Sequence, residues 1–295
     1  MSDFRLKVFQ SVAKNLSFTK ASQELFVSQP AITKHIQELE ATYQTRLFDR
    51  QGSKISLTES GRLLLEHCER ILEDYKRLEY EMHLLHNEYI GELKLGASTT
   101  IAQYVLPPLL GSFIGKFPQV NLSLLNGNSR EIEAALQEHR IDLGLVEGVF
   151  RLPNLKYTTF LEDELVAVVH SKSRLQLPEE ITPQDLPAIL LVLRERGSGT
   201  LDVIERSLQK HGVKLSSLHV LMYLGSTESI KLFLENSDCM GIVSIRSICK
   251  ELAAGTFRVV EIKDMPMLRD FCFVQLQGQE GGLSQAFMNY MFMSR

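Results

Sequence analysis

A proline-free stretch between Thr58 and about Asn87 constrains this sequence more than any other feature. Its apolar residues alternate spacings of four and three, as Leu64, Cys68, Ile71, Tyr75, Leu78, Met82 and Leu85. This heptad pattern predicts one long helix with a single apolar seam, formed by those seven residues. We expect the seam to bury itself against the same helix of a second copy, giving a homodimer. The alternative is that it packs on the C-terminal part of its own chain.

The residues before this helix predict a helix-turn-helix. Ser17 is a plausible N-cap for a short helix over about Thr19 to Leu25. Ser28 is a second N-cap, and Pro30 suits the first turn of the next helix, which is expected to run to about Thr42. Two helices joined by so short a turn are typical of DNA-binding domains.

The helix after Ser28 has one apolar and one polar face. At 100° per residue Ile32, Ile36 and Leu39 lie together and are expected to pack inward. Amides can bond adenine and lysine can reach guanine or phosphate, so the polar face suits base edges. An ordinary solvated face is the alternative. The expected DNA-binding residues of this helix are Ser28, Gln29, Pro30, Thr33, Lys34 and Gln37.

Two short apolar pieces flanking a basic turn follow, and they predict a β-hairpin wing. Arg50 and Lys54 are expected to contact phosphates there, giving position rather than sequence information, unless they serve only solubility. The first 58 residues hold eight Lys or Arg and five acidic residues, whereas the whole chain carries −4. The predicted DNA-binding section is therefore the positive part of an acidic chain.

Beyond residue 90 apolar runs alternate with helical segments, which predicts parallel sheets with helices on their faces, in one domain or two lobes. The expected strands are 92–97, 120–125, 142–146, 165–170, 188–193, 218–224 and 241–244. The expected helices are 101–117, 130–138, 200–211 and 227–236.

Hydroxyl and amide side chains stand at four of the strand-to-helix junctions. In doubly wound sheets ligands bind at the carboxyl ends of strands against helix N-termini, where N–H groups favour anions. Arg194 can add a bidentate bond to a carboxylate, sulfate or phosphate. The alternative is that each junction is only an N-cap and Arg194 only a surface residue. The candidate effector residues are Ser98, Thr99, Thr100, Asn128, Ser129, Arg194, Ser198, Thr200 and Thr227.

Composition and motifs argue against other classes of protein. Hydrophobic residues make up 44%, and no apolar run suits a membrane helix. Residues 1–9 lack a signal-peptide core, so we expect a cytosolic protein with no membrane partner. No nucleophile elbow, phosphate loop or zinc helix is found, so no catalytic residue, metal or cofactor is predicted. The four cysteines read as reduced core residues, with a redox pair of Cys239 and Cys249 as the alternative.

The N-terminal sixty residues contain an ordered, dense series of motifs. It consists of Ser17-Phe18-Thr19-Lys20-Ala21, Leu25, Ser28-Gln29-Pro30-Ala31-Ile32-Thr33, Ile36, Leu39-Glu40, Leu47-Phe48, Arg50 and Leu57-Thr58-Glu59-Ser60-Gly61. In this series the chain resembles the LysR-type transcriptional regulators. The run Arg194 to Thr200 is similar to one in members that govern carbon fixation and sulfur assimilation, although Arg196 and Leu201 depart from it. Tyr43-Gln44 stands where the family has Leu-Gly, so we expect a differently shaped loop before the wing.

The resemblance implies an α/β chain with a winged helix-turn-helix at 1–58, a linker helix at 59–89 and an effector domain at 90–295. The effector domain would have two lobes like a periplasmic binding protein, about 90–162 plus 268–295 and about 163–267. Crossover strands are expected near 158–163 and 263–269. The partners implied are double-stranded DNA, a small anionic metabolite, and further copies in a homodimer or homotetramer. RNA polymerase is a further candidate partner. The resemblance favours Ser98, Thr100, Asn128 and Thr200 for the cleft.

Overall fold

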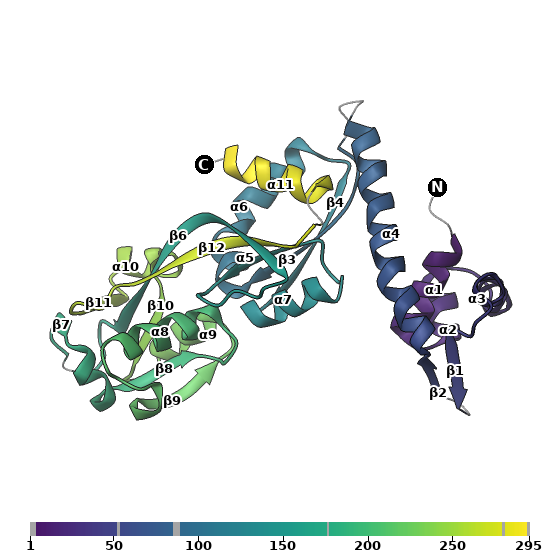
Figure 1. Ribbon diagram of the computed structural model, residues 1–295. Helices are drawn as coiled ribbons and strands as arrows, with labels where there is room; N and C mark the ends of the chain where they lie inside the picture. The colour runs from purple at the N-terminus through teal and green to yellow at the C-terminus, as the bar shows by residue number, and fades with distance from the viewer. Residues whose placement is uncertain (1–3, 52–53, 85–88, 176, 279–280, 294–295) are drawn as a thin grey trace. The chain divides into compact units, whose positions relative to one another are not determined.

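The computed structural model describes residues 4–51, 54–84, 89–175, 177–278 and 281–293 (Figure 1). Its contacts divide the chain into two compact units, Met1–Glu88 and Tyr89–Arg295. None of the helices within these ranges is long and apolar enough to cross a membrane.

The N-terminal unit packs three short helices against a hairpin and the start of a long helix. Ser17 accepts a hydrogen bond from Lys20 N (3.2 Å) and Ser28 accepts one from Ala31 N (3.4 Å), so both predicted N-caps are confirmed. The core includes Val8, Phe9, Val12, Ile32, Ile36, Leu39 and Leu47. The elements are α1 (Phe4–Asn15), α2 (Phe18–Glu24), α3 (Gln29–Tyr43), β1 (Phe48–Gln51), β2 (Lys54–Leu57) and α4 (Glu59–Leu84).

The predicted seam of α4 is wrong in its first half. Cys68 is fully buried in the core of its own N-terminal unit, where its thiol contacts Leu6 O at 3.2 Å. Burial raises the pKa of the Cys68 thiol to about 12, so it stays neutral. Leu72, which lies off the predicted seam, is buried beside it. Of the remaining seam residues, Ile71, Leu78 and Met82 are 41%, 53% and 53% exposed, and Leu85 lies outside the described residues.

The end of α3 shows how the chain replaces the family's glycine. Gln44 is the C-cap and takes a left-handed conformation with φ +49°. Its N–H and that of Thr45 reach Ala41 O and Glu40 O (3.4 and 3.1 Å). A non-glycine residue therefore keeps the left-handed cap here, at a conformational cost that glycine avoids.

The second unit is built on one mixed sheet with the strand order β4-β3-β5-β12-β6-β10-β8-β9, and β11 pairs with both β6 and β7. Its strands are β3 (Gly91–Ser98), β4 (Val120–Gly127), β5 (Leu143–Glu147), β6 (Leu155–His170), β7 (Glu180–Ile181), β8 (Leu190–Arg194), β9 (His219–Leu224), β10 (Met240–Ser244), β11 (Phe257–Ile262) and β12 (Met267–Leu276). Its helices are α5 (Thr99–Tyr104), α6 (Leu106–Lys116), α7 (Ser129–Gln137), η1 (Pro183–Ala188), α8 (Gly199–Lys210), η2 (Leu215–Ser217), α9 (Thr227–Leu234), η3 (Ile245–Ser247), α10 (Cys249–Ala253) and α11 (Gly282–Met293).

Three sequence expectations need correction in this unit. The sheet is not purely parallel, because β6 runs antiparallel to β10, β11 and β12. The strand expected at 165–170 is only the end of β6, which begins at Leu155 and contains the expected crossover 158–163. The helix expected over 101–117 breaks at Val105, since Pro107 and Pro108 start a new helix and supply no N–H to continue the old one.

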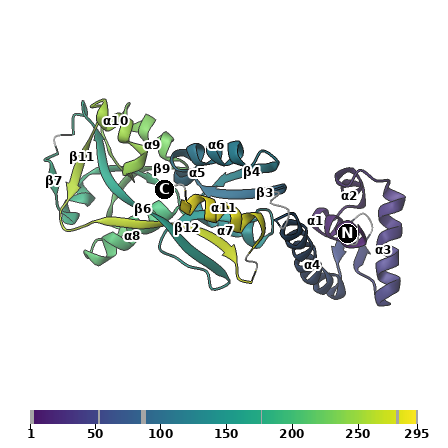
Figure 2. The same cartoon turned by 90° about the horizontal axis from the view of Figure 1, so that it is seen from above.

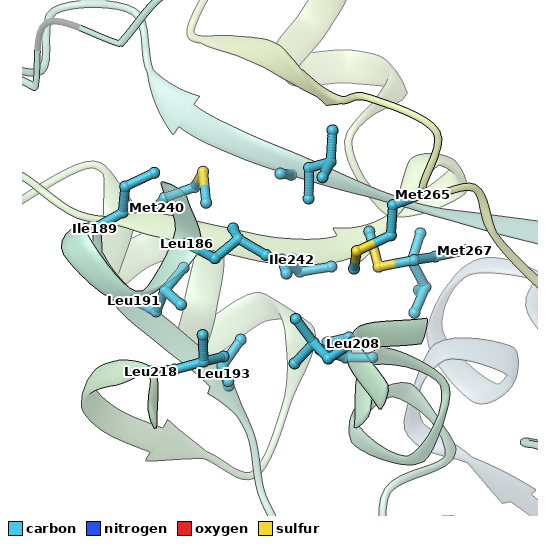
Figure 3. Close-up of a cluster of buried hydrophobic side chains, with 14 of the residues drawn as sticks. Leu186, Ile189, Leu191, Leu193, Leu208, Leu218, Met240, Ile242, Met265 and Met267 are labelled. Atoms are coloured by element: carbon cyan, nitrogen blue, oxygen red, sulfur yellow. The ribbon is translucent and has the colours of Figure 1, made fainter. Parts of the chain in front are cut away.

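Two lobes share this sheet. In the first lobe (β3–β5, α5–α7 and α11), α7 covers one face of the strands and α6 with α11 the other (Figure 1). Seen from above in Figure 2, α11 and α7 overlap. In the second lobe (β7–β11 and α8–α10), Leu191 and Leu193 of β8 pack towards α8, whereas Val192 packs towards α9. Figure 3 shows the α8 side of this core, which methionines from β10 and β12 complete.

β6 and β12 join the two lobes. They remain paired from Leu155 with Leu276 to Leu165 with Met267, with one register shift between Phe271 and Cys272. Both strands extend from the first lobe into the second in Figure 1. The expected crossover 263–269 overlaps the start of β12.

The four cysteines are free thiols. Cys68, Cys239 and Cys272 are buried, as the core-residue prediction requires. Cys249 is exposed on α10, so that prediction is wrong for it. A redox pair gains no support, because Cys239 contacts Ser237 Oγ (3.2 Å) and Cys249 contacts Ile245 O (3.3 Å).

Candidate functional site

The polar face of α3 is free, as the sequence predicted. Ile32, Ile36 and Leu39 are at most 4% exposed. On the other face Gln29, Pro30, Lys34 and Gln37 are exposed and Thr33 is half-buried. The side chains of Thr33 and Gln29 each make one hydrogen bond within the N-terminal unit. Thr33 donates to Gln29 O (3.1 Å), and Thr19 donates to Gln29 Oε1 (3.4 Å). The face can therefore enter a major groove without rearranging the core.

The wing is a two-stranded antiparallel hairpin. Arg50 pairs with Ile55 and Gln51 with Lys54, so both predicted phosphate-binding residues lie beside the connection between the strands. The side chains of Arg50 and Lys54, like the tip at residues 52–53, lie outside the described part of the structure. Their contact with phosphates stays a prediction.

In the second unit, two sets of parallel strands meet at their carboxyl ends. β3, β4 and β5 end at Ser98, Gly127 and Glu147 in the first lobe, and β8 and β10 end at Arg194 and Ser244 in the second. Hydrogen bonds join the two lobes across these strand ends. We call the region where the two sets of strand ends face each other the interlobe cleft. This is where doubly wound sheets bind ligands.

Helix caps account for part of the predicted effector set. Asn128 forms a capping box with Glu131, accepting from its backbone N–H at 3.0 Å. Ser198 caps α8 by accepting from Leu201 N at 3.2 Å. Ser98, by contrast, makes no cap bond, because its hydroxyl donates to the carboxylate of Glu147. At the fourth junction Ser226 caps α9 by accepting from Ser229 N at 3.1 Å. Thus the N-cap alternative holds for three of the four junctions and fails at Ser98.

Arg269 and Glu147 form the buried ionic centre of the cleft. Arg269 Nε donates to Asp163 Oδ2 (2.8 Å), and Nη1 donates to Thr200 Oγ1 (2.9 Å). The same Nη1 lies 3.5 Å from Glu147 Oε1. All four residues are at most 4% exposed. Glu147 also fixes Ser129, which donates to its backbone carbonyl at 2.7 Å.

Arg194 is the second buried cation of the cleft. Its Nε and Nη2 make a bidentate contact with Glu195 of its own chain (2.8 and 3.0 Å). Nη2 also reaches across to Thr99 Oγ1 (3.2 Å) and to Gly225 O (3.3 Å). Arg194 is 1% exposed, and its Nη1 has no hydrogen-bond partner. Thr100 Oγ1 is likewise buried without a partner.

The lobes approach so closely at α8 that a glycine is required. A Cβ on Gly199 would lie 2.0 Å from Glu147 O, so no other residue fits without movement. Nearby, Arg130 N donates to Gly197 O at 3.3 Å. The N-terminus of α8 is therefore closed against the end of β5.

A second interlobe contact involves Tyr104 at the end of α5. Its hydroxyl donates to Glu228 of α9, whose carboxylate also accepts from Lys231 Nζ (2.8 Å). Burial opposes the charge on Lys231, but the carboxylates of Glu228 and Glu251 outweigh it and raise the lysine pKa. These residues hold the lobes together outside the predicted effector set.

The structure thus brings most predicted effector residues to one cleft, and Thr227 is buried at the start of α9. Sequence reasoning missed Glu147, Asp163, Arg269 and Ser244, which donates to Asp163 Oδ1 (2.7 Å). Asp163 and Arg269 each lay at the end of an expected crossover strand, which was the signal available for these two residues. Within the described residues, no group of His, Cys, Asp and Glu could hold a metal ion.

Comparison with family models assigns both units. Residues 4–62 match the bacterial regulatory helix-turn-helix protein of the lysR family, and residues 86–292 match the LysR substrate binding domain. The chain belongs to the LysR family of transcriptional regulators. It is therefore a DNA-binding regulator with an effector-binding domain, and the predicted family and fold class are confirmed.

Named relatives agree with this assignment. The HTH-type transcriptional regulator CysL of Bacillus subtilis (strain 168) is 29% identical over 91% of this chain and 89% of its own length. A probable RuBisCO transcriptional regulator of Cyanidioschyzon merolae (strain NIES-3377 / 10D) is 32% identical over 90% of this chain and 88% of its own. The CcmR regulatory domain of Synechocystis PCC6803, solved in complex with 2-PG, superimposes with TM-score 0.62 at 28% identity, covering 69% of this chain and 97% of that one.

Proposed function

We propose that the effector is a small anion bound in the interlobe cleft, between Arg194 and the residues at the end of β3 and the N-terminus of α8. The observation that carries this is the buried guanidinium of Arg194, whose Nη1 lacks a partner. Buried donors are normally satisfied, and a charged one is costly to leave open. Thr100 Oγ1 and the α8 N-terminus supply further polar groups of the kind that bind a carboxylate or phosphate.

The chain's own carboxylates stand in for the ligand in this arrangement. Glu195 occupies Arg194 bidentately, as an effector carboxylate would, and Glu147 lies against Arg269. Because the cleft residues are almost wholly buried, an entering anion must part the lobes and displace Glu195. The effector then favours one lobe arrangement, and that population shift changes how copies pair on DNA. The relative solved with 2-PG carries an anion of the kind proposed.

The test is isothermal calorimetry of the full chain with sulfate, phosphate and 2-phosphoglycolate. We expect Arg194→Met to weaken anion binding at least about tenfold and the exposed neighbour variant Arg196→Met to leave it unchanged. Removing the internal competitor in Glu195→Gln should instead tighten binding, provided the variant folds as the wild type does. Absence of binding by all three anions, or unchanged affinity in Glu195→Gln, would contradict the proposal.

We infer that the DNA is read by α3, with Gln29, Lys34 and Gln37 towards bases and the wing on phosphates. Homodimerisation through the exposed half of α4, at Ile71, Leu78 and Met82, would present two such helices to two half-sites. A homotetramer would use further apolar surface, which the edge strand β9 supplies at Leu221, Met222 and Tyr223. Sedimentation at several concentrations tests both states.

We propose in addition that residues 1–58 bind DNA, residues 59–89 form the linker and dimerisation helix, and residues 90–295 bind the effector. Contact with RNA polymerase and a location in the cytosol, where the DNA is, belong to the same proposal. We propose further that the effector is released unchanged, because the family models matched by this chain are those of transcriptional regulators. Recovery of a chemically altered ligand after incubation would contradict this.

A further inference from the structure

Phe26 is the most exposed large apolar side chain in the described ranges, at 95%. It lies in the turn between α2 and α3, and its neighbours behave differently. Leu25 and Val27 are half-buried and pack against the core of the N-terminal unit. The turn is thus anchored on both sides, and the ring between the anchors points into solvent.

The backbone at Phe26 is strained as well. Its φ is +54°, in the left-handed region that bulky aromatic residues rarely adopt. Two hydrogen bonds fix this conformation, from Phe26 N to Gln23 O (3.4 Å) and from Val27 N to Ser22 O (3.1 Å). Glycine or asparagine would suit the position better, and neither would expose an aromatic ring. Stability of the folded chain therefore gives no reason for phenylalanine here.

The surroundings of Phe26 point to an occupant. Two residues later Ser28 caps α3, and the first turn of that helix exposes Gln29, the leading candidate for base contact. Lys20 and Lys34 are exposed cations on α2 and α3. Glu24 is the acidic residue nearest in sequence, and its carboxylate is held back by Ser11 and Asn15 (2.8 and 2.6 Å). This surface suits a polyanion.

We propose that Phe26 is a DNA contact, whose ring packs on apolar surface of the duplex beside the base pair approached by Gln29. A phenyl ring cannot bond a phosphate, so its partner must be a thymine 5-methyl in the major groove or a deoxyribose. This inference rests on the DNA-reading role of α3. It adds a contact residue that the periodicity of α3 could not predict, because Phe26 lies in the turn before that helix.

The experiment compares binding of a duplex enriched by the wild-type chain from a random library, measured by fluorescence anisotropy at one salt concentration. Phe26→Asn removes the ring and suits the backbone; we expect affinity to fall about tenfold while the Tm stays equal or rises. Phe26→Leu should restore most of the affinity. Tyr43→Asn is the matched control, since it removes a 53% exposed aromatic from the far end of α3 and should leave affinity within about twofold.

Replacing each half-site thymine with deoxyuridine separates the two partners. If a methyl is contacted, one replacement weakens wild-type binding as much as Phe26→Asn does and leaves the variant unaffected. If no replacement acts while Phe26→Asn still weakens binding, the contact is a deoxyribose. Unchanged affinity in Phe26→Asn overturns the proposal, although Gln29 could still read bases. A lower Tm, or a changed oligomeric state in sedimentation, would show that the ring serves the protein instead.

Discussion

The two polar surfaces of this chain are prepared for their partners in opposite ways. On α3 the side chains facing outward have few partners of their own, and the apolar face beneath them is buried in the core. In the interlobe cleft nearly every polar group is buried and already bonded to another group of the chain. The DNA surface is therefore ready before its partner arrives, whereas the cleft must first exchange internal bonds for external ones.

This difference has an energetic consequence. Exposed side chains on α3 can change with little effect on folding, because they leave no unsatisfied group behind. Each cleft residue supports others, so its loss affects stability and effector response together.

The sharpest test is removal of the buried cation that binds both lobes' carboxylates. We expect Arg269→Ala to lower the free energy of unfolding of the second unit by about 3–5 kcal/mol, because the buried carboxylates of Asp163 and Glu147 lose the buried cation between them. Arg246→Ala is the control: its guanidinium lies 3.6 Å from the same Asp163 but is 42% exposed, so the loss should stay below about 1 kcal/mol. Urea titration measures both. Equal losses would break the contrast between a buried and an exposed surface.

Next in size is the effect of trimming the exposed half of α4. Leu78→Ala combined with Met82→Ala should weaken dimerisation by about 2–4 kcal/mol, since both side chains would be buried between copies. Leu63→Ala trims a 60% exposed leucine off the seam and should leave the dimer unchanged. Sedimentation equilibrium reports the dissociation constants. A dimer that persists in the double variant would locate the interface elsewhere.

A smaller effect is expected for the base-reading amide. Gln29→Ala should cost about 1–3 kcal/mol of discrimination between the operator and unrelated DNA, with the unfolding free energy nearly unchanged. Lys54→Ala should instead weaken all sequences alike and flatten the dependence on salt. Binding titrations on both duplexes at several salt concentrations separate the two. Equal loss on all sequences in Gln29→Ala would remove it from base readout.

The smallest effect concerns proton uptake in the second unit. Burial raises the pKa of Glu133, although a hydrogen bond from Tyr157 Oη (2.7 Å) opposes the shift. A carboxyl with a raised folded-state pKa takes up protons on folding, so its contribution to stability is lost as pH rises through that pKa. Glu133→Gln keeps an acceptor for Tyr157 and does not titrate. The free energy of unfolding of Glu133→Gln should therefore increase relative to that of the wild type as pH rises. Urea unfolding across a pH series measures both free energies, and a difference between them that does not change with pH would contradict this prediction.

The sequence predicted local features and missed those that depend on distant residues. The inward face of α3 follows from the spacing of Ile32, Ile36 and Leu39 alone. The link from Arg269 to Asp163 joins positions 106 residues apart, which no spacing reveals. The α4 seam failed for a related reason. Heptad spacing shows that Cys68 is buried, but not whether its neighbour is a second helix or the chain's own α1.

The long pairing of β6 with β12 has a mechanical consequence. The two lobes are connected by one hydrogen-bonded pair of strands, β6 and β12. Rotation of one lobe against the other would therefore change the twist of this strand pair. The register shift at Phe271 and Cys272 is where such a strand pair yields most easily, since a bulge leaves a residue unpaired. Release of the ligand would let the strand pair recoil, and the closed arrangement would then restore itself.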